Sequence, residues 1–377
     1  MNRAKVLIVD DSALMRELLA DILGRAADLE VVGSARDPSQ AGPMIARLRP
    51  QVVTLDVEMP NCDGITFLEQ LMRTNPVPVI MVSSVTERGS ELALRALELG
   101  AVDVVEKPKL DLKAGVLERA DELVMKVRAA VSSRPRPRPR PISLPSVARQ
   151  PTASRNPGTV PHVSPVSSAR SPALIPVSQR PGGAVKRLIV IGASTGGTEA
   201  LCELLRELPT DCPPVLIVQH MPGAFTGKFA ERLNLLCRIR VREAKDGDTL
   251  EPGTALIGPG GLHLRVASGK SSLVVRLNGE PASLFHKPSV DVLFESVASL
   301  VGKRAIGVIL TGMGADGARG LLEMRRAGSR TFAQDEASCV VFGMPKEAIA
   351  RGAVERVLPL QSIARAVMNV ASERSPG

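Results

Sequence analysis

Short apolar runs alternate with amphipathic segments over the first 131 residues. Runs at 6–9, 31–34, 52–55, 77–82 and 102–105 predict strands, and the segments after them predict helices near 12–24, 38–48, 65–73, 89–99 and 112–130. Strands that are apolar at nearly every position are typical of a parallel sheet covered on both faces. The pattern therefore predicts an α/β domain with a (βα)5 order over residues 1–131.

The periodic pattern stops at residue 132. The stretch that begins SSRPRPRPRP is rich in Pro, Arg and Ser and shows neither a helical nor a strand period. Its few large apolar side chains cannot offset the entropy of ordering. We predict a linker over residues 132–184, extended at the Arg-Pro repeat and flexible after it.

The alternation resumes in residues 185–377. Strands are predicted near 187–191, 215–218 and 305–310, and helices near 198–208, 226–236, 290–300 and 315–327. A strand-rich stretch at about 239–278 interrupts the order. We therefore expect a second, doubly wound α/β domain with a strand insertion.

The basic charge of the chain is concentrated in the predicted linker. The formal net charge is +9 overall, −4 over residues 1–131, +9 over 132–186 and +4 over 187–377. Trp and Tyr are absent and Phe numbers 7, so a platform for stacking bases has few side chains to build on. We expect no nucleic-acid partner, and a basic tail that binds nucleic acid is the alternative.

Cysteine usage and hydropathy indicate a cytoplasmic protein. The five cysteines are dispersed with no C-x-x-C spacing, which argues for reduced thiols and against a disulfide framework or a zinc site. The sequence contains no run of 18 apolar residues, so we expect no membrane span. The first five residues lead directly into a predicted strand, so we expect no secretory signal.

Polar residues gather at the carboxyl ends of the predicted N-terminal strands. They are Asp10 and Asp11 after the first strand, Asp56 at the third, Ser83 at the fourth and Lys107 after the fifth. Ligands bind at this edge of an open parallel sheet. Three converging carboxylates would bind Mg²⁺, and a carboxylate beside the ion can attack a phosphoryl donor. Each aspartate taken alone can equally be a helix cap.

This set, with the stretch LDVEMP at 55–60 and Asp63-Gly64, resembles the response-regulator receiver family over about residues 4–128. The resemblance implies that a histidine kinase phosphorylates Asp56. It implies further that Asp10, Asp11 and Asp56 hold Mg²⁺ and that Ser83 and Lys107 act as the switch hydroxyl and lysine. Val104 departs from the family, which usually has an aromatic residue there.

A glycine-rich turn carries the first chemical motif of the C-terminal half. Residues 192–197 read GASTGG between a predicted strand and a predicted helix, which satisfies G-x-S-x-G in a strand–turn–helix context. Ser194 is then exposed beside helix N-terminal amides, which favour developing negative charge. A phosphate-binding loop is the rival interpretation, but it would require Gly-Lys-Ser/Thr, which is absent.

A nucleophilic serine requires a base and an orienting carboxylate. His220 follows the predicted strand at 215–218, and Asp316 follows the one at 305–310. His162 lies in the linker, and His263 and His286 lie in less regular stretches. The order Ser, His, Asp differs from the Ser, Asp, His order of α/β-hydrolases, which indicates convergent chemistry on another doubly wound sheet.

The second half resembles the methylesterase family of bacterial chemotaxis over about residues 185–370. The motifs are IGASTGGTEAL, VQHMP, HKPSVDVLF, LTGMGADGA and AQDEASCVVFGMP. The resemblance implies hydrolysis of glutamate methyl esters and deamidation of glutamines on chemoreceptors, with no cofactor for the hydrolysis. Ser194 would be the nucleophile, His220 the base and Asp316 its partner. The backbone amides near Thr195 and Met313 would form the oxyanion hole.

Two other classes of protein stay open from the residues alone. A transcriptional regulator would carry a helix-turn-helix after the receiver, and no such pattern follows. A metabolic serine esterase joined to a receiver would require a deep apolar pocket for a small substrate, which a sequence does not exclude.

Overall fold

The computed structural model describes residues 3–59, 64–84, 86–108, 115–133, 187–270, 272–279 and 286–373. The predicted linker lies outside these residues except for Ser132 and Ser133. Pro60, Asp63 and His162 also lie outside them.

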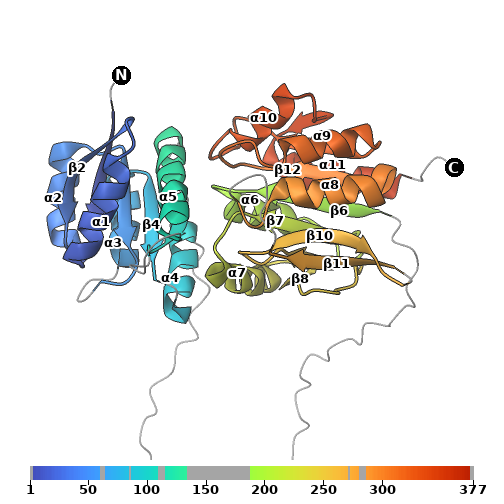
Figure 1. Ribbon diagram of the computed structural model, residues 1–377, viewed down its shortest axis with the longest axis horizontal. Coiled ribbons are helices and arrows are strands. Elements are labelled where there is room, and N and C mark those ends of the chain that lie inside the picture. Colours follow the sequence, from blue (N-terminus) through green and yellow to red (C-terminus); the bar gives the residue numbers. More distant parts are fainter. Residues whose placement is uncertain are drawn as a thin grey trace, which may run out of the picture. The chain divides into compact units, whose positions relative to one another are not determined.

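The N-terminal residues form the predicted (βα)5 sheet (Figure 1). Its strands follow the order β2-β1-β3-β4-β5, and every neighbouring pair is parallel. The elements are β1 (Ala4–Val9), α1 (Ala13–Gly24), β2 (Leu29–Ala35), α2 (Pro38–Leu48), β3 (Val52–Asp56), α3 (Gly64–Thr74), β4 (Val79–Ser83), α4 (Glu87–Glu98), β5 (Asp103–Glu106) and α5 (Gly115–Ser132). The predicted fold class is confirmed for this half of the chain.

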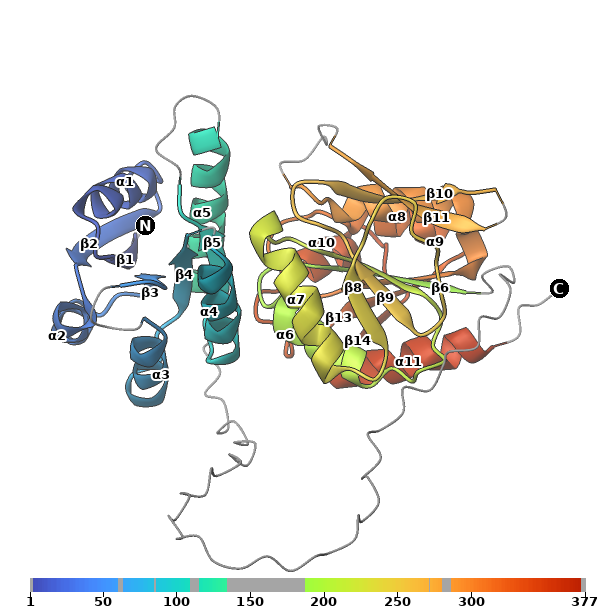
Figure 2. The same ribbon diagram turned by 90° about the horizontal axis from the view of Figure 1, so that it is seen from below.

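Successive side chains of β1 are buried on opposite faces of the sheet, each against a different layer of helices. In β1, Val6 and Ile8 pack with α1 and α5, whereas Leu7 and Val9 face the layer that contains α2 and α3 (Figure 2). All four side chains are at most 1% exposed. Burial on both faces explains why the strand is apolar at successive positions.

The C-terminal residues form a seven-stranded parallel sheet and a separate antiparallel hairpin. The strand order is β14-β13-β12-β6-β7-β9-β8, and β10 pairs with β11 in the hairpin. The elements are β6 (Leu188–Ala193), α6 (Gly197–Arg206), β7 (Val215–Gln219), α7 (Gly223–Leu236), β8 (Arg240–Glu243), β9 (Thr254–Ile257), β10 (His263–Ser268), β11 (Leu273–Asn278), α8 (Val290–Leu300), the 3₁₀ turn Gly302–Arg304, β12 (Ala305–Ile309), α9 (Ala318–Arg326), β13 (Arg330–Gln334), α10 (Met344–Ala350), β14 (Arg356–Leu358) and α11 (Leu360–Ser372). The predicted strand insertion thus has two parts, because β8 and β9 extend the main sheet while β10 and β11 stand apart.

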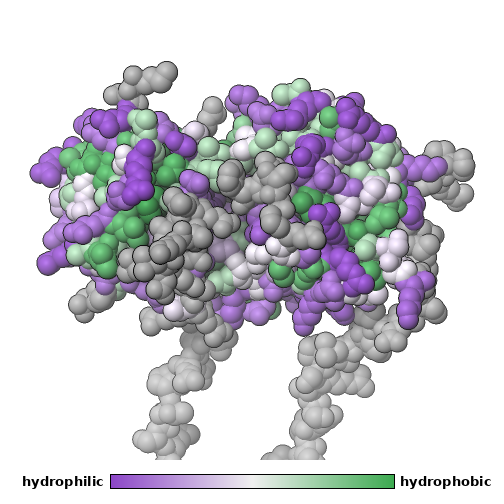
Figure 3. Space-filling model, viewed as in Figure 1, coloured by the Kyte–Doolittle hydropathy of each residue, from purple (hydrophilic) through white to green (hydrophobic). Residues whose placement is uncertain are grey.

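Strand β6 lies in the middle of the C-terminal sheet and is apolar on both sides. Ile189 and Ile191 pack with the layer of α6, α7 and α11, and Leu188 and Val190 pack with the layer of α8 and α9. Hydrophilic side chains cover the outer surface around α9 (Figure 3). The amphipathic helices therefore cover both faces of this central strand.

The order of the strands brings distant loops to one edge. From β6 the chain turns to β7 on one side and later returns through β12 on the other side. Gly192 of β6 is in register with Val218 of β7 and with Ile309 of β12. The segments after these three strands therefore emerge side by side, at the point where the strand order reverses, which is where open parallel sheets bind ligands.

Within the described residues, no helix combines the length and hydrophobicity that a membrane crossing requires. The cysteines at positions 202, 212, 237 and 339 are free thiols.

Gly192 makes a testable contribution to the packing of this sheet. A Cβ atom there would lie 2.2 Å from Cγ1 of Val290, at the start of α8. We predict that Gly192→Ala destabilises the C-terminal domain by about 1–3 kcal/mol through overpacking. The measurement is the urea midpoint of the full chain. Gly279→Ala is the control, because its new Cβ would meet only Leu262 Cδ2 at 3.7 Å, and equal midpoints for the two variants would contradict the prediction.

Candidate functional site

An acidic crevice lies at the carboxyl edge of the N-terminal sheet. Asp10 follows β1, Asp56 ends β3, and carboxylate oxygens of Asp10, Asp11 and Asp56 all lie within 4.8 Å of one another. Nζ of Lys107, which follows β5, lies 2.7 Å from Oδ2 of Asp56 and 3.0 Å from Oδ2 of Asp10. Ser83 is the last residue of β4 and is buried. The structure thus gathers the predicted receiver residues at one edge.

The charges of this crevice are only partly balanced. Burial raises the pKa of Asp56 to about 6, against the opposing effect of Lys107. Burial acts to lower the pKa of Lys107, but its hydrogen bond and charge interaction with Asp56 outweigh burial and raise it. The ammonium of Lys107 contacts two of the three carboxylates, those of Asp10 and Asp56. The donor set is made of carboxylate oxygens, which suits a hard divalent cation such as Mg²⁺.

Ser194 sits in a tight turn between β6 and α6. Its backbone N–H donates to the carbonyl of Thr311 over 3.0 Å, and its carbonyl accepts from the N–H of Gly197 over 2.7 Å. Gly196 has a φ of 77°, a left-handed conformation that glycine adopts without strain. A Cβ at Gly312 would lie 2.6 Å from Cβ of Ser194, so the loop after β12 approaches the serine closely only because it has no side chain there.

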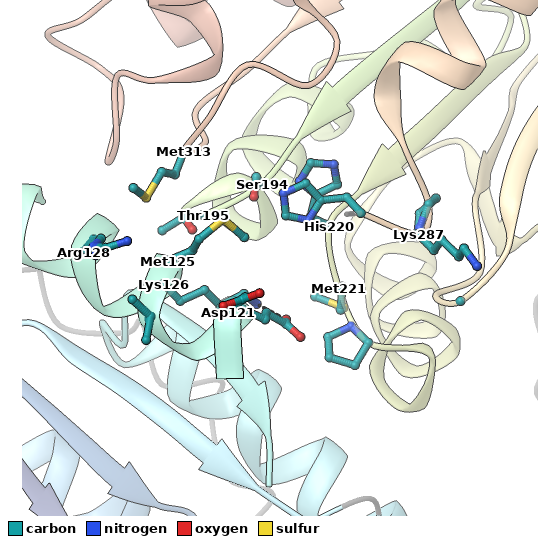
Figure 4. A pocket seen from close by; sticks show the side chains of 16 residues that line it. Asp121, Met125, Lys126, Arg128, Ser194, Thr195, His220, Met221, Lys287 and Met313 are labelled. Atoms are coloured by element: carbon teal, nitrogen blue, oxygen red, sulfur yellow. Dashed lines mark ion pairs between the residues drawn. The ribbon is translucent and has the colours of Figure 1, made fainter. Parts of the chain in front are cut away.

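His220 and Asp316 form a buried pair beside this turn. Nε2 of His220 lies 2.8 Å from Oδ2 of Asp316. Nδ1 of His220 is buried and makes no hydrogen bond with the described residues, and no hydrogen bond joins it to Ser194 Oγ. If Nε2 carries the proton that Asp316 accepts, Nδ1 is the ring nitrogen with a free lone pair. Figure 4 shows Ser194 next to this imidazole, and both residues line one pocket.

The amino end of α8 holds the carboxylate of Asp316. Oδ1 accepts from Oγ of Ser289 over 2.8 Å and from the N–H of Asp291 over 3.0 Å, and Oδ2 accepts from the N–H of Val290 over 2.7 Å. Burial alone would raise the pKa of Asp316, but His220 and the backbone amides outweigh burial and hold it below its usual range. Asp316 is therefore ionised, which suits a partner for an imidazolium.

A second histidine stacks on the first. The ring centroids of His286 and His220 are 4.2 Å apart, with planes 18° from parallel. The charge of His220 and then burial lower the pKa of His286 to about 3, so its ring is neutral near pH 7. His263 occupies a structural place, because its Nδ1 accepts from the backbone N–H of Ser289 over 3.2 Å.

Two backbone amides near Ser194 remain available to a ligand. In the part of the chain that the structure describes, the N–H groups of Thr195 and Met313 donate to no protein acceptor. Both residues line the same pocket as Ser194 and His220 (Figure 4). Free N–H groups near a nucleophile can bind an oxygen that develops negative charge.

Sequence reasoning missed three neighbours of these residues. The sequence places His286 only in a less regular stretch, although its ring stacks on that of His220. Ser289 and Gln219 were not singled out, although Ser289 contacts Asp316 and Gln219 donates to the carbonyls of Ser194 and His220. A serine directly before the apolar run at 290–294 is a signal for a helix cap, but nothing in the sequence shows what the cap contacts.

Fold and geometry define a class of protein. A receiver-type sheet with an acidic crevice is joined in one chain to a second α/β domain in which a buried His–Asp pair lies beside the turn of Ser194. This is the architecture of a response regulator whose output domain is an enzyme.

Comparison with known proteins agrees with this class and narrows it. The family model described as CheB methylesterase matches residues 189–367, and that of the response regulator receiver domain matches residues 6–115. A protein-glutamate methylesterase/protein-glutamine glutaminase 1 of Geobacter metallireducens is 54% identical over 361 residues, which cover 96% of this chain and 94% of the relative. One of Burkholderia lata is 52% identical over 98% of this chain and 96% of its own.

One solved structure is similar to part of the chain. The Thermotoga maritima CheB methylesterase catalytic domain is 36% identical and has a TM-score of 0.48, covering 49% of this chain and 98% of that chain. On the strength of the near full-length relatives, the chain belongs to the family of protein-glutamate methylesterases/protein-glutamine glutaminases.

Removal of the Ser289 hydroxyl should weaken catalysis through Asp316. Ser289→Ala deletes a hydrogen bond to an ionised carboxylate, worth about 1.5 kcal/mol, so we expect kcat/KM for ester hydrolysis to fall about tenfold. Ser329→Ala is the matched control, because Ser329 is also buried and donates to the carbonyl of Gly302. Similar losses in both variants would mean that Ser289 acts only on stability.

Proposed function

We propose that the chain hydrolyses γ-glutamyl methyl esters on chemoreceptors and deamidates receptor glutamines, under control of phosphorylation at its receiver, in the adaptation of bacterial chemotaxis. The observation that carries this proposal is the pair His220–Asp316, buried beside the turn of Ser194 with an ionised carboxylate. The names of the relatives supply the substrate class.

The acylation step uses four groups of this chain. Oγ of Ser194 attacks the carbonyl carbon of the methyl ester while Nδ1 of His220 takes the hydroxyl proton. The oxyanion that forms is bound by the free N–H groups of Thr195 and Met313. Asp316 keeps Nε2 protonated and stabilises the imidazolium. Collapse expels methoxide, which takes the proton from Nδ1 and leaves as methanol.

The second half of the cycle regenerates the serine. Water gives a proton to Nδ1 of His220 and attacks the acyl carbonyl. The tetrahedral intermediate then collapses to a glutamate side chain on the receptor and expels Oγ of Ser194, which takes the proton back from Nδ1. Deamidation of a glutamine follows the same path with ammonia as the leaving group. Both reactions create a carboxylate on the receptor, and so both increase its negative charge.

The receiver supplies the control. We infer that a chemotaxis histidine kinase in the cytoplasm donates a phosphoryl group to Asp56. Asp10, Asp11 and Asp56 would hold Mg²⁺, which neutralises charge on the phosphoryl oxygens when it is bound. Lys107 and Ser83, at the ends of neighbouring strands, would then contact the phosphoryl oxygens.

Substitution of the triad should abolish hydrolysis and spare phosphorylation. We expect Ser194→Ala and His220→Ala to lower methanol release from methylated receptor membranes by roughly 10³-fold or more. Asp316→Asn should also be severely impaired, because the imidazole loses its acceptor. Phosphorylation of Asp56 is the internal control for folding, and an active His220→Gln beside an inactive His286→Gln would reassign the base.

Phosphorylation should depend on the cation and on Asp56. Chelation of Mg²⁺ should block labelling by the phosphorylated kinase, because the carboxylates of Asp10, Asp11 and Asp56 otherwise repel the phosphoryl group. Asp56→Asn should prevent labelling and leave only basal esterase activity. Transfer of radioactive phosphate is the measurement, and labelling that persists in EDTA or in the Asn variant would contradict the assignment.

A further inference from the structure

The two free amides that the proposed function uses share a structural property. An N–H lies on the same planar peptide unit as the carbonyl of the preceding residue and points the opposite way. The N–H of Thr195 is thus fixed by whatever holds the carbonyl of Ser194. Likewise, the N–H of Met313 is fixed by whatever holds the carbonyl of Gly312.

Both of these carbonyls accept two hydrogen bonds. The carbonyl of Gly312 accepts from the backbone N–H groups of Gly343 and Met344, over 3.0 and 2.8 Å. The carbonyl of Ser194 accepts from the N–H of Gly197 over 2.7 Å and from Nε2 of Gln219 over 2.9 Å. Of these four donors, only that of Gln219 belongs to a side chain, so it alone can be removed without a change in the backbone.

Gln219 is placed to act on both sides of the site. It is the last residue of β7, is 1% exposed, and also donates from Nε2 to the carbonyl of His220 over 3.2 Å. One amide group thus joins the peptide after the nucleophile to the residue that carries the base. Its position between the two turns is not explained by the hydrophobic core, which would favour an apolar side chain here.

The carbonyl oxygen of the Gln219 side chain, in contrast, is buried in an unfavourable environment. Oε1 of Gln219 is buried and accepts no hydrogen bond from the described residues. A Cβ at Gly197 would lie 2.1 Å from this oxygen, so a side chain there would displace the amide of Gln219. An acceptor left unpaired in the interior is unfavourable, and such groups are expected where they serve another purpose.

We propose that Gln219 is a positioning residue for the oxyanion hole. Its Nε2–H fixes the Ser194–Thr195 peptide so that the N–H of Thr195 points at the oxyanion, and it polarises that peptide so that the N–H donates more strongly. This inference rests on the proposed function, because it takes the amide of Thr195 as an oxyanion donor. The hydrogen bond acts in the transition state, so its loss lowers kcat and leaves KM nearly unchanged.

The test is Gln219→Met in the full chain, which keeps the length and approximate volume of the side chain and removes its donor. Thr331→Val is the control. It deletes a buried hydroxyl that accepts from the N–H of Glu355, and Thr331 lies near the amino end of β13, whereas the site lies at the carboxyl ends of the strands. Rates are expressed per site titrated with a fluorophosphonate that reacts with Ser194, so that partly unfolded protein is not counted.

We expect kcat of Gln219→Met to fall about 10- to 100-fold, somewhat less than on removal of an oxyanion donor, with KM within about twofold. A second readout is the affinity for an alkyl boronic acid that forms an anionic tetrahedral adduct with Ser194. This affinity should fall by a similar factor, while Thr331→Val changes neither quantity by more than about twofold.

The positioning role of Gln219 and the catalytic role of Ser194 are contradicted by different results. If Ser194→Ala is inactive and Gln219→Met keeps wild-type kcat and boronate affinity, Gln219 has no role in positioning and the triad stands. A rise in KM with unchanged kcat would also overturn the inference, because Gln219 would then act on substrate binding. A fully active Ser194→Ala would overturn the proposed function itself.

Discussion

The buried carboxylate of Asp316 is the group around which the C-terminal site is organised. A carboxylate that is 4% exposed is unfavourable unless donors replace its lost water, and here a hydroxyl, two backbone amides and an imidazole do so. Two of these donors belong to the first turn of α8, whose dipole also favours a negative charge. The position of α8 against β6 and β12 is thus tied to the electrostatics of His220.

The two sheets place their polar residues in the same way, but the pKa of the central carboxylate is shifted in opposite directions. In both, residues at the carboxyl edges of neighbouring parallel strands meet at the reversal of strand order. In the receiver, burial raises the pKa of Asp56 to about 6, although the ammonium of Lys107 opposes this shift. In the esterase, the donors around Asp316 lower its pKa. The first crevice gathers three carboxylates and suits a cation, whereas the carboxylate of the second already has its donors and suits proton transfer.

The sequence predicts the elements well because both sheets are parallel and are covered by helices on both faces. Strands that are buried on both faces are apolar at successive positions, so β1, β3, β6 and β12 stand out, and polar residues at their ends mark the sites. The predicted insertion at 239–278 was less well resolved. Strands β8 and β9 join the main sheet and β10 and β11 do not, and pairing between strands leaves no trace in a single sequence.

The supporting residues could not be predicted for a related reason. His286 and Ser289 precede α8 in the chain but act on His220 and Asp316, which follow other strands. Gln219 acts on the peptide after Ser194 through a hydrogen bond between neighbouring strand ends. Such contacts depend on side-chain direction across the sheet, whereas composition and period report only on one element at a time.

The central pairing of the catalytic sheet has a consequence for the synthesis of the protein. Ala305 of β12 pairs with Leu188 of β6, 117 residues earlier in the chain, and this ladder brings the loop of Asp316 to the turn of Ser194. Pairs so far apart in sequence form slowly, because a long loop must close before any contact rewards it. A ribosome-bound chain that ends before β12 therefore contains Ser194 and His220 but not Asp316, the carboxylate that contacts Nε2 of His220. The C-terminal site can therefore assemble only after β12 has been synthesised, whereas all five strands of the receiver sheet precede residue 107.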